Sequence, residues 1–152
     1  MLAVWLGLAS TAPLAADFAV NAGAIEVVAL PWAHAGLYPY VGGSVAFPLA
    51  HVTLIAALSV EWSFDQGRGG LVAAGTADFP LGPHLGVDLN LTFIHDMPGA
   101  RVADSVFYLG LGPGVSIFLG RWAISPYVGV FTGLSAPGFS LVPGVNVAFT
   151  IG

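Results

Sequence analysis

The residue types that could perform nucleophilic catalysis meet at one place in the sequence, where His95, Asp96 and Ser105 flank the longest predicted loop. Hydrolysis or acyl transfer by serine needs a histidine base that is held in place by an acid. No acid is placed to orient His95, and Asp96 precedes Met97-Pro98-Gly99, a sequence typical of a turn. The sequence therefore predicts no catalytic residues, and we expect the protein not to be an enzyme.

The sequence also gives no support for a metal site, a phosphate-binding loop or a nucleic-acid-binding surface. The chain has no cysteine, and its four histidines are too scattered for a metal site. Gly110-Leu111-Gly112-Pro113-Gly114 is rich in glycine but lacks the lysine and the following helix of a phosphate-binding loop. With three arginines and no lysine, the chain could not neutralise the phosphates of a nucleic acid. We expect no metal, no cofactor and no nucleic-acid partner.

Four acidic residues stand in the interiors of stretches predicted to be strands, namely Glu26, Glu61, Asp78 and Asp88, whereas all three arginines fall in loops or turns. Because an unpaired charge in a low-dielectric interior is costly, we expect Glu61 and Asp88 to be hydrogen-bonded to hydroxyl or amide groups, or hydrated, rather than ion-paired. The predicted interior polar cluster comprises Glu61, Asp88, Asp78, His84, Asn90, Thr76, Ser59, Tyr40, Tyr108 and Tyr127.

One pair in this cluster is predicted in detail. A short turn at Pro80-Leu81-Gly82 would place Asp78 directly opposite His84, with both side chains inward. Many other inward positions hold glycine, alanine or serine, so the interior is either a wet cavity or is filled by inward tyrosines. A continuous cavity lined by these acids would prefer cations.

Composition indicates which elements position these residues. Of the 152 residues, 57% are hydrophobic and 7% are charged, the net charge is -5, and the mean hydropathy is +0.88. A soluble domain carries about 25% charged residues, so this chain could not cover a water-facing surface, and it is too hydrophobic to be disordered. A single membrane domain follows.

A membrane can be crossed by helices or by a closed barrel. The best helical candidate, Val41–Val60, contains Pro48 close to the paired Gly42 and Gly43. Because 21 glycines and 11 prolines divide the chain into pieces of about ten residues, transmembrane strands explain it better. A helical membrane protein and an unusual soluble β-barrel or sandwich are the alternatives.

Eight strands are predicted, with short turns alternating with longer loops. An even number of strands places both termini on the short-turn side, which is periplasmic in outer-membrane barrels. Leu89 and Leu91 alternate with Asp88 and Asn90, and the polar set is too small to form a solvent surface, so apolar side chains face outward and polar ones inward. The predicted strands are Asp17–Leu30, Gly36–Phe47, Val52–Phe64, Gly70–Phe79, Gly82–His95, Ser105–Leu119, Trp122–Gly133 and Phe139–Ile151.

Aromatic residues gather at the two ends of the predicted strands, as expected of rings at the two lipid interfaces. The two predicted girdles are Phe18, Phe47, Phe79, Trp122 and Phe149 at the short-turn ends, and Trp62, Phe64, Phe93, Phe107 and Phe139 at the long-loop ends.

The first strand breaks the pattern, because strict alternation would turn Glu26 toward lipid at a cost of about 2 kcal/mol or more near mid-depth. We therefore predict a bulge near Gly23, which turns Glu26 inward and places Ile25 and Val27 outside.

The segment Met1–Ala16 is different in character. Apolar Leu2–Leu8 is followed by small residues and by Pro13-Leu14-Ala15-Ala16, which predicts a secretory signal peptide cleaved before Asp17, although it lacks a basic start. A retained N-terminal helix or apolar strand is the alternative. The barrel domain is predicted to cover residues 17–152.

Several stretches resemble the small eight-stranded outer-membrane β-barrels of Gram-negative bacteria, of the OmpA/OmpX type. They are Tyr38-Pro39-Tyr40-Val41-Gly42-Gly43, Ser125-Pro126-Tyr127-Val128-Gly129 and the last strand, Gly144 to Phe149, which resembles the terminal assembly signal. The chain departs from that signal by ending Phe149-Thr150-Ile151-Gly152 rather than on an aromatic residue.

The resemblance implies an all-β, up-and-down antiparallel transmembrane barrel in the outer membrane of the cell envelope. It implies a non-enzymatic structural, anchoring or partner-binding role, with outer-membrane lipids and other envelope proteins as partners. A narrow transport or small-ligand-binding barrel with an acidic, cation-preferring interior is the first alternative. A lipid-modifying enzyme, of a kind found among such barrels, is the second.

Overall fold

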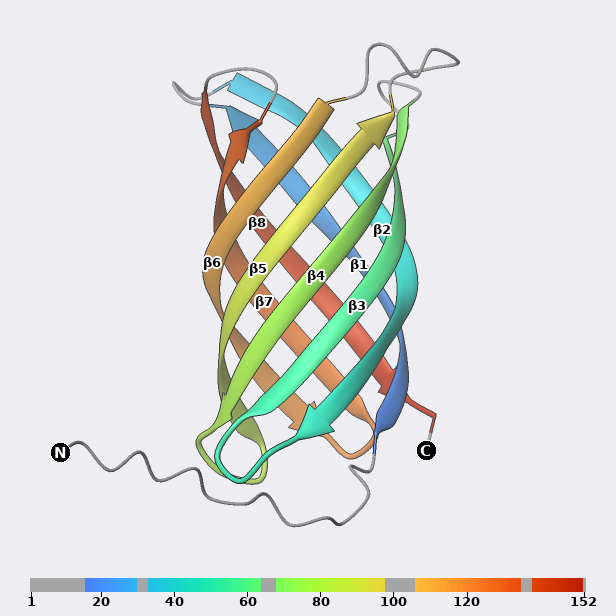
Figure 1. Cartoon of the computed structure of the whole chain (residues 1–152), viewed down its shortest axis with the longest axis vertical. Coiled ribbons are helices and arrows are strands. Elements are labelled where there is room, and N and C mark those ends of the chain that lie inside the picture. The colour runs from blue at the N-terminus through green and yellow to red at the C-terminus, as the bar shows by residue number, and fades with distance from the viewer. Residues whose placement is uncertain (1–15, 30–32, 64–67, 98–105, 135–137, 152) are drawn as a thin grey trace, which may run out of the picture.

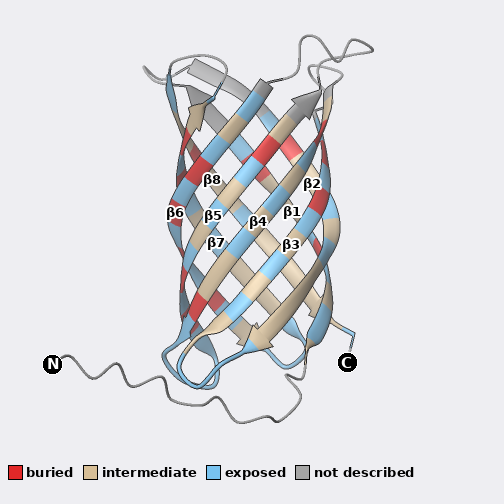
Figure 2. Ribbon diagram, viewed as in Figure 1, coloured by how far each residue is buried: buried red, intermediate tan, exposed pale blue. Residues whose placement is uncertain are grey.

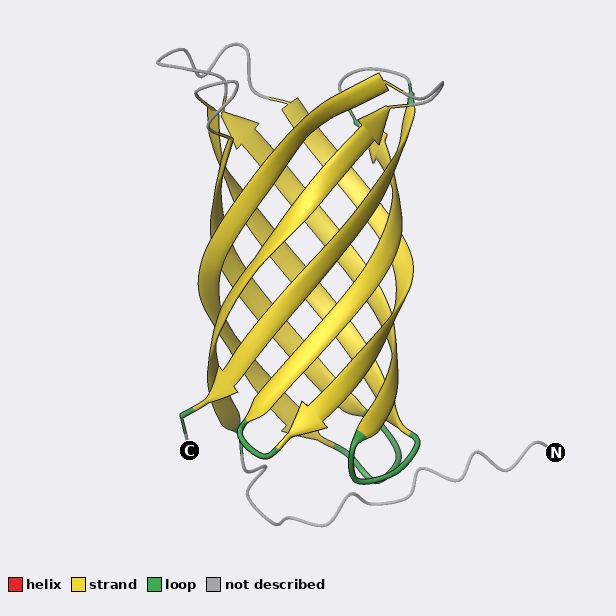
Figure 3. Ribbon diagram, turned by 180° about the vertical axis from the view of Figure 1, so that it is seen from behind, coloured by secondary structure: helices red, strands yellow, loops and turns green. Residues whose placement is uncertain are grey.

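The chain folds into a closed barrel of eight strands, seen in a computed structural model that describes residues 16–29, 33–63, 68–97, 106–134 and 138–151 (Figure 1). Every regular element in these ranges is a strand (Figure 3), and they contain no helix long and apolar enough to cross a membrane. The strands are β1 (Asp17–Ala29), β2 (Ala33–Pro48), β3 (Thr53–Ser63), β4 (Arg68–Pro80), β5 (Leu85–Met97), β6 (Val106–Leu119), β7 (Trp122–Gly133) and β8 (Phe139–Thr150). The predicted fold class is confirmed.

Each strand pairs antiparallel with the next, and β1 pairs with β8 to close the barrel. The first strand begins and the last strand ends at the same end of the barrel as the three short turns, at the bottom of Figure 1. We call this the short-turn end and the opposite one the long-loop end. The tightest turn is Gly120-Arg121, where Gly120 has a φ of 65°, a backbone conformation that glycine adopts without steric cost.

The two faces of the wall have opposite chemistry. Along β3, Leu58 and Val60 are 62% and 53% exposed on the outside, whereas Ser59 and Glu61 are buried inside. Exposed residues alternate in this way with intermediate or buried ones along most of β3, β4, β5 and β6 (Figure 2). Because large aliphatic side chains cover the outside of the barrel, that surface suits lipid rather than water. The assignment of apolar side chains outside and polar or small ones inside is confirmed.

The bulge predicted near Gly23 was wrong. Ile25 is buried, Glu26 is exposed on the outer face, and the irregularity in the β1–β2 pairing lies beyond it, between Val27 and Val28. Gly23 instead leaves room for the side chain of Tyr40, because an added Cβ at Gly23 would lie 2.5 Å from the Tyr40 hydroxyl oxygen. Glu26 stands near the long-loop end of β1, where an outward acid costs less than at the membrane midplane.

The predicted contact between Asp78 and His84 was also wrong. The connection between β4 and β5 is Leu81–His84, so Asp78 pairs with Asp88, and His84 lies exposed in the turn. The shift in pairing preserves the alternation, so Asp78 still faces inward although its partner changes. His84 Nδ1 lies 3.3 Å from the carbonyl oxygen of Phe118, outside the interior polar cluster.

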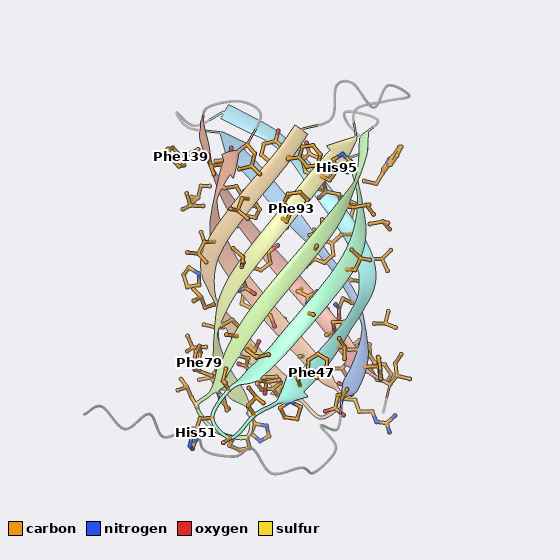
Figure 4. All side chains as sticks on the ribbon, in the orientation of Figure 1. Phe47, His51, Phe79, Phe93, His95 and Phe139 are labelled. Carbon is orange, nitrogen blue, oxygen red and sulfur yellow. The ribbon has the colours of Figure 1, made fainter. Side chains whose placement is uncertain are left out.

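The aromatic side chains project at both ends of the barrel, as the labelled rings of Figure 4 show. At the short-turn end Phe18, Phe79 and Trp122 are exposed, and the ring of Trp122 packs 4.8 Å from that of Phe149. At the long-loop end Trp62, Phe93, Phe107 and Phe139 are exposed, and Phe47 at the short-turn end is half-buried. Phe64 lies outside the described residues. Contact of these rings with the lipid interfaces stays a prediction.

Candidate functional site: the barrel interior

The half of the interior nearer the long-loop end is occupied by large, buried side chains. Its core is a cluster that we call the apolar layer, and Val72, Tyr40, Tyr108 and Tyr127 pack against it. Inward residues of a narrow barrel that carry such volumes fill the lumen. The apolar layer consists of Ile25, Tyr38, Ile94, Phe131 and Val142.

Glycines on the same strand or on a neighbouring strand make room for these rings. A Cβ added at Gly129 would lie 2.6 Å from the Phe131 ring, and one at Gly110 would meet the same ring. A Cβ added at Gly144 would lie 2.5 Å from the Tyr127 ring. The sequence offered these inward glycines as evidence for a cavity. In the half nearer the long-loop end, however, the space beside them is filled by aromatic rings.

A hydrogen-bonded tyrosine network lies beside the apolar layer. The hydroxyl groups of Tyr40 and Tyr127 are hydrogen-bonded to each other, and Tyr40 donates to Asn146 Oδ1 at 3.2 Å and to the Val145 carbonyl oxygen at 3.3 Å. Buried Glu61 is close enough to Tyr127 to act on its hydroxyl group electrostatically. Three residues that the sequence placed in the interior cluster thus lie together here.

The half nearer the short-turn end is hollow. A cavity of about 420 Å³ extends from the underside of the apolar layer, at Ile94 and Phe131, to exposed residues of the short-turn end, including Pro80 and Arg121. This volume is within the roughly 300–1,000 Å³ typical of small-molecule pockets. Its wall is built mainly from small side chains of the inward positions, including Ala19, Ser44, Ala57, Ala74, Thr92 and Ala148.

Two carboxyl groups face each other in the wall of this cavity. Asp78 and Asp88, which we call the acid pair, are direct partners on β4 and β5, are 4% and 3% exposed, and lie close enough to interact. Asp88 Oδ2 accepts a hydrogen bond of 2.7 Å from Ser116, whose hydroxyl group lies 2.8 Å from that of Ser125. Gly86 provides the space for the Asp78 carboxyl group, which an added Cβ would meet.

The carboxyl groups of Asp78 and Asp88 are hydrogen-bonded to each other. Apart from this contact, no donor among the described residues reaches Asp78 Oδ1 or Asp88 Oδ1, although both atoms are buried. Most buried polar atoms in native proteins have a partner, and here the two carboxyl groups are partners for each other. Arg121 is the only basic residue among the described residues lining the cavity, and it lies exposed in the turn at its mouth.

The other predicted cluster residues are distributed over both halves. Thr76 donates a hydrogen bond of 2.7 Å to Asn90 Oδ1 in the hollow half, and Ser59 is buried in the cavity wall. Tyr108 packs against the apolar layer. Ser116 and Ser125 were missed, although the inward parity of Gly110, Gly112 and Gly114 in the same strand as Ser116 points to the first of them.

Of the residues considered for catalysis, His95 is the one whose side chain is described. His95 stacks on Phe107 at a ring distance of 4.4 Å, while the side chain of Asp96 and the whole of Ser105 lie outside the described residues. The described side chains include no group of three or more His, Cys, Asp or Glu residues that could hold a metal ion.

Fold and wall chemistry together define a closed eight-stranded antiparallel barrel with an apolar outer face, the architecture of small transmembrane barrels. Neither a family model nor a curated protein matches the sequence. Among solved structures, the chain is similar to Neisserial surface protein A (NspA), with 12% identity over 90% of this chain and 97% of that one, and a TM-score of 0.55.

Two further structures resemble the chain. One is the N-terminal β-barrel domain of Pseudomonas aeruginosa OprF, with 18% identity over 86% of this chain and 97% of that one, and a TM-score of 0.50. The other comes from the de novo design of transmembrane β-barrels, with 10% identity over 88% and 95%, and a TM-score of 0.55. At such identities the likeness concerns the fold alone, and at that level it confirms the resemblance inferred from the sequence.

Proposed function

We propose that the protein is a non-conducting, non-enzymatic outer-membrane barrel that serves as an anchor or binding partner for other envelope components. The observation that carries this proposal is the apolar layer, since Ile25, Tyr38, Ile94, Phe131 and Val142 stand buried across the lumen. A lumen closed by packed apolar side chains offers an ion no hydrated path, because a bare charge in such a medium is strongly disfavoured. The short connections suit contacts with lipids and envelope proteins rather than a large external binding surface.

Planar-bilayer recording tests the proposal. The refolded chain should insert without opening steps, whereas transport, the first alternative, requires conductance with a preference for cations. If the wild type conducts, a double variant with Glu61→Gln and Asp88→Asn decides whether the interior acids set that preference. Stable cation-selective conductance by the wild type would overturn the proposed function.

The location in the cell is a second part of the proposal. With β1 beginning and β8 ending at the short-turn end, we place both termini in the periplasm, and we assign residues 1–16 to a cleaved signal peptide. A C-terminal epitope tag should then be found in the outer-membrane fraction and be protected from protease in intact cells. A tag that is digested in intact cells would reverse the orientation.

A further inference from the structure

The cavity of the hollow half is open at one end and closed at the other. Asp17, Pro80 and Arg121 line it at the short-turn end and are exposed, whereas Ile94 and Phe131 line its far end and are buried in the apolar layer. A small molecule that enters from the short-turn end therefore reaches a blind pocket of about 420 Å³. The inward side chains between the mouth and the apolar layer decide what this pocket can hold.

All three asparagines of the chain line this pocket, at a similar depth. Counted from the short-turn end, Asn21 is the fifth residue of β1, Asn146 the fifth of β8 and Asn90 the sixth of β5. The strands β1 and β8 are paired, and β5 lies four strands away from β1 on the opposite wall. Three carboxamide groups therefore face the lumen from two opposite sides at one level.

The oxygen of each carboxamide group already accepts a hydrogen bond. Asn21 Oδ1 accepts from the hydroxyl group of Ser44 at 3.2 Å. Asn90 Oδ1 accepts from Thr76 at 2.7 Å, and Asn146 Oδ1 accepts from the tyrosine network. The polar group that each side chain has left is its NH2 group, which carries two N–H donors and no acceptor. At this level the pocket is therefore complementary to a ligand with an acceptor oxygen.

The charges around the pocket favour an uncharged ligand. Asp78 and Asp88 lie between the mouth and the asparagines, but their carboxyl groups are hydrogen-bonded to each other and their Oδ1 atoms are buried in the wall. A cation therefore finds no open Oδ1 acceptor here, and an anion is disfavoured because it must pass two acids. At the mouth, the exposed side chains of Asp17 and Arg121 carry opposite charges, which water and salt screen.

Beyond the asparagines the pocket becomes largely apolar. Val72, Ala74 and Ile94 line it there, beside Thr92, on the way to the apolar layer. We propose that the pocket binds a small uncharged carbonyl compound that enters from the short-turn end. Its oxygen accepts hydrogen bonds from the asparagine NH2 groups, and its apolar body packs against the side chains beyond them. The volume of about 420 Å³ accommodates a single-ring ketone with room for water.

Fluorine NMR on the refolded full chain in detergent tests this site with para-fluoroacetophenone as the probe. The matched ligand is para-fluoroethylbenzene, which has nearly the same shape but lacks the carbonyl oxygen, and empty micelles give the background partition of each. After that correction we expect the ketone to bind about tenfold more tightly, the gain from about two neutral hydrogen bonds. Equal affinities, or no binding of either probe, would overturn the proposal, because the pocket would then be merely apolar or filled with water.

The asparagine side chains give a direct readout of the same contact. In nitrogen-labelled protein, their NH2 signals should shift with the ketone and stay close to their free positions with the hydrocarbon. Signals that do not respond to the ketone would show that the NH2 groups are not its donors, and would overturn the proposal.

Variants locate the binding. The double change Asn21→Leu with Asn90→Leu nearly keeps the side-chain volume but removes two NH2 groups. It should weaken binding of the ketone about tenfold and change binding of the hydrocarbon less than about twofold. Unchanged binding of the ketone would overturn the proposal.

A second pair of variants keeps the proposal falsifiable if the double variant does not refold. Ala74→Leu narrows the pocket without altering a polar group and should weaken both probes about tenfold or more. Ala73→Leu makes the same change at the neighbouring exposed position of β4 and should alter neither affinity. Unchanged binding in Ala74→Leu would place the probes outside the pocket.

Charged analogues separate the remaining ligand classes. The cation para-fluorobenzylammonium and the anion para-fluorobenzoate should each bind more weakly than the ketone. Tighter binding of either ion would overturn the assignment to an uncharged ligand. The binding result is independent of the bilayer recording, so this inference and the proposed function can fail separately.

Discussion

The two halves of the barrel interior are built from the same eight strands and follow the same alternation, yet one is packed and the other is hollow. Toward the long-loop end, inward glycines such as Gly110 and Gly129 stand next to the ring of Phe131. Toward the short-turn end, many inward positions hold small residues, and a cavity of about 420 Å³ remains between them, which Phe118 lines without filling it. Glycine alone therefore indicates neither a cavity nor a packed core, because the outcome depends on the side chains at the adjacent inward positions.

The largest expected contrast is Phe131→Ala, which removes the ring at the centre of the apolar layer. Burial of this side chain to 4% exposure predicts a loss of about 3–5 kcal/mol in the free energy of unfolding. Urea unfolding in lipid vesicles measures it, with Phe139→Ala, an outward change at the same end, as the control expected to cost about 1 kcal/mol or less. Similar losses in both variants would show that the layer is not a packed core.

The next contrast adds volume instead of removing it. Gly129→Ala places a Cβ about 2.6 Å from the Phe131 ring and should destabilise the barrel by about 1–3 kcal/mol. Gly75→Ala adds the same methyl group at an outward position with nothing within 4 Å, where it should be neutral or slightly stabilising. The same unfolding assay compares the two variants. If Gly129→Ala is tolerated as well as Gly75→Ala, the Phe131 ring does not pack tightly against Gly129.

A smaller effect is expected in the hollow half from Ser116→Ala. The change removes the 2.7 Å donor to Asp88 Oδ2 and leaves another acceptor of the acid pair unsatisfied, at a cost of about 1–2 kcal/mol. In the background Asp88→Asn, the side-chain amide can take over hydrogen bonding, and the cost of Ser116→Ala should fall. A double-mutant cycle measures the difference, and strict additivity would mean that this hydrogen bond contributes nothing.

The smallest effect is expected from Ala74→Val, which adds two methyl groups to the wall of the cavity. Because free space lies in front of Ala74, the change should alter stability by no more than about 1 kcal/mol, in contrast to the single methyl group at Gly129. A loss as large as that of Gly129→Ala would show that the lower half is also tightly packed.

Alternation in the sequence was sufficient to predict the fold, the two faces and the inward placement of Glu61, Asp78 and Asp88. Alternation could not predict which residues pair across a turn, because that depends on the length of the turn. The connection Leu81–His84 is longer than the turn that would bring Asp78 opposite His84. The side on which Glu26 lies depends on where a single irregularity falls, and it fell between Val27 and Val28. No sequence pattern encodes side-chain volumes across a lumen, so the division into packed and hollow halves required coordinates.

The seam between β1 and β8 has a consequence for the order of assembly. Every other pairing joins strands adjacent in sequence, whereas this one joins the two ends of the chain, and its described pairs skip Glu26 and Val27. The free-energy cost of closing a loop grows only slowly with its length, by about 0.6 kcal/mol for each doubling. The long sequence separation between β1 and β8 therefore slows their pairing more than it lowers the stability of the pairing. The seven pairings between consecutive strands can form locally, but the barrel closes only when β1 pairs with β8. We expect amide protons along this seam to be the last to gain protection from hydrogen exchange during folding and the first to lose it.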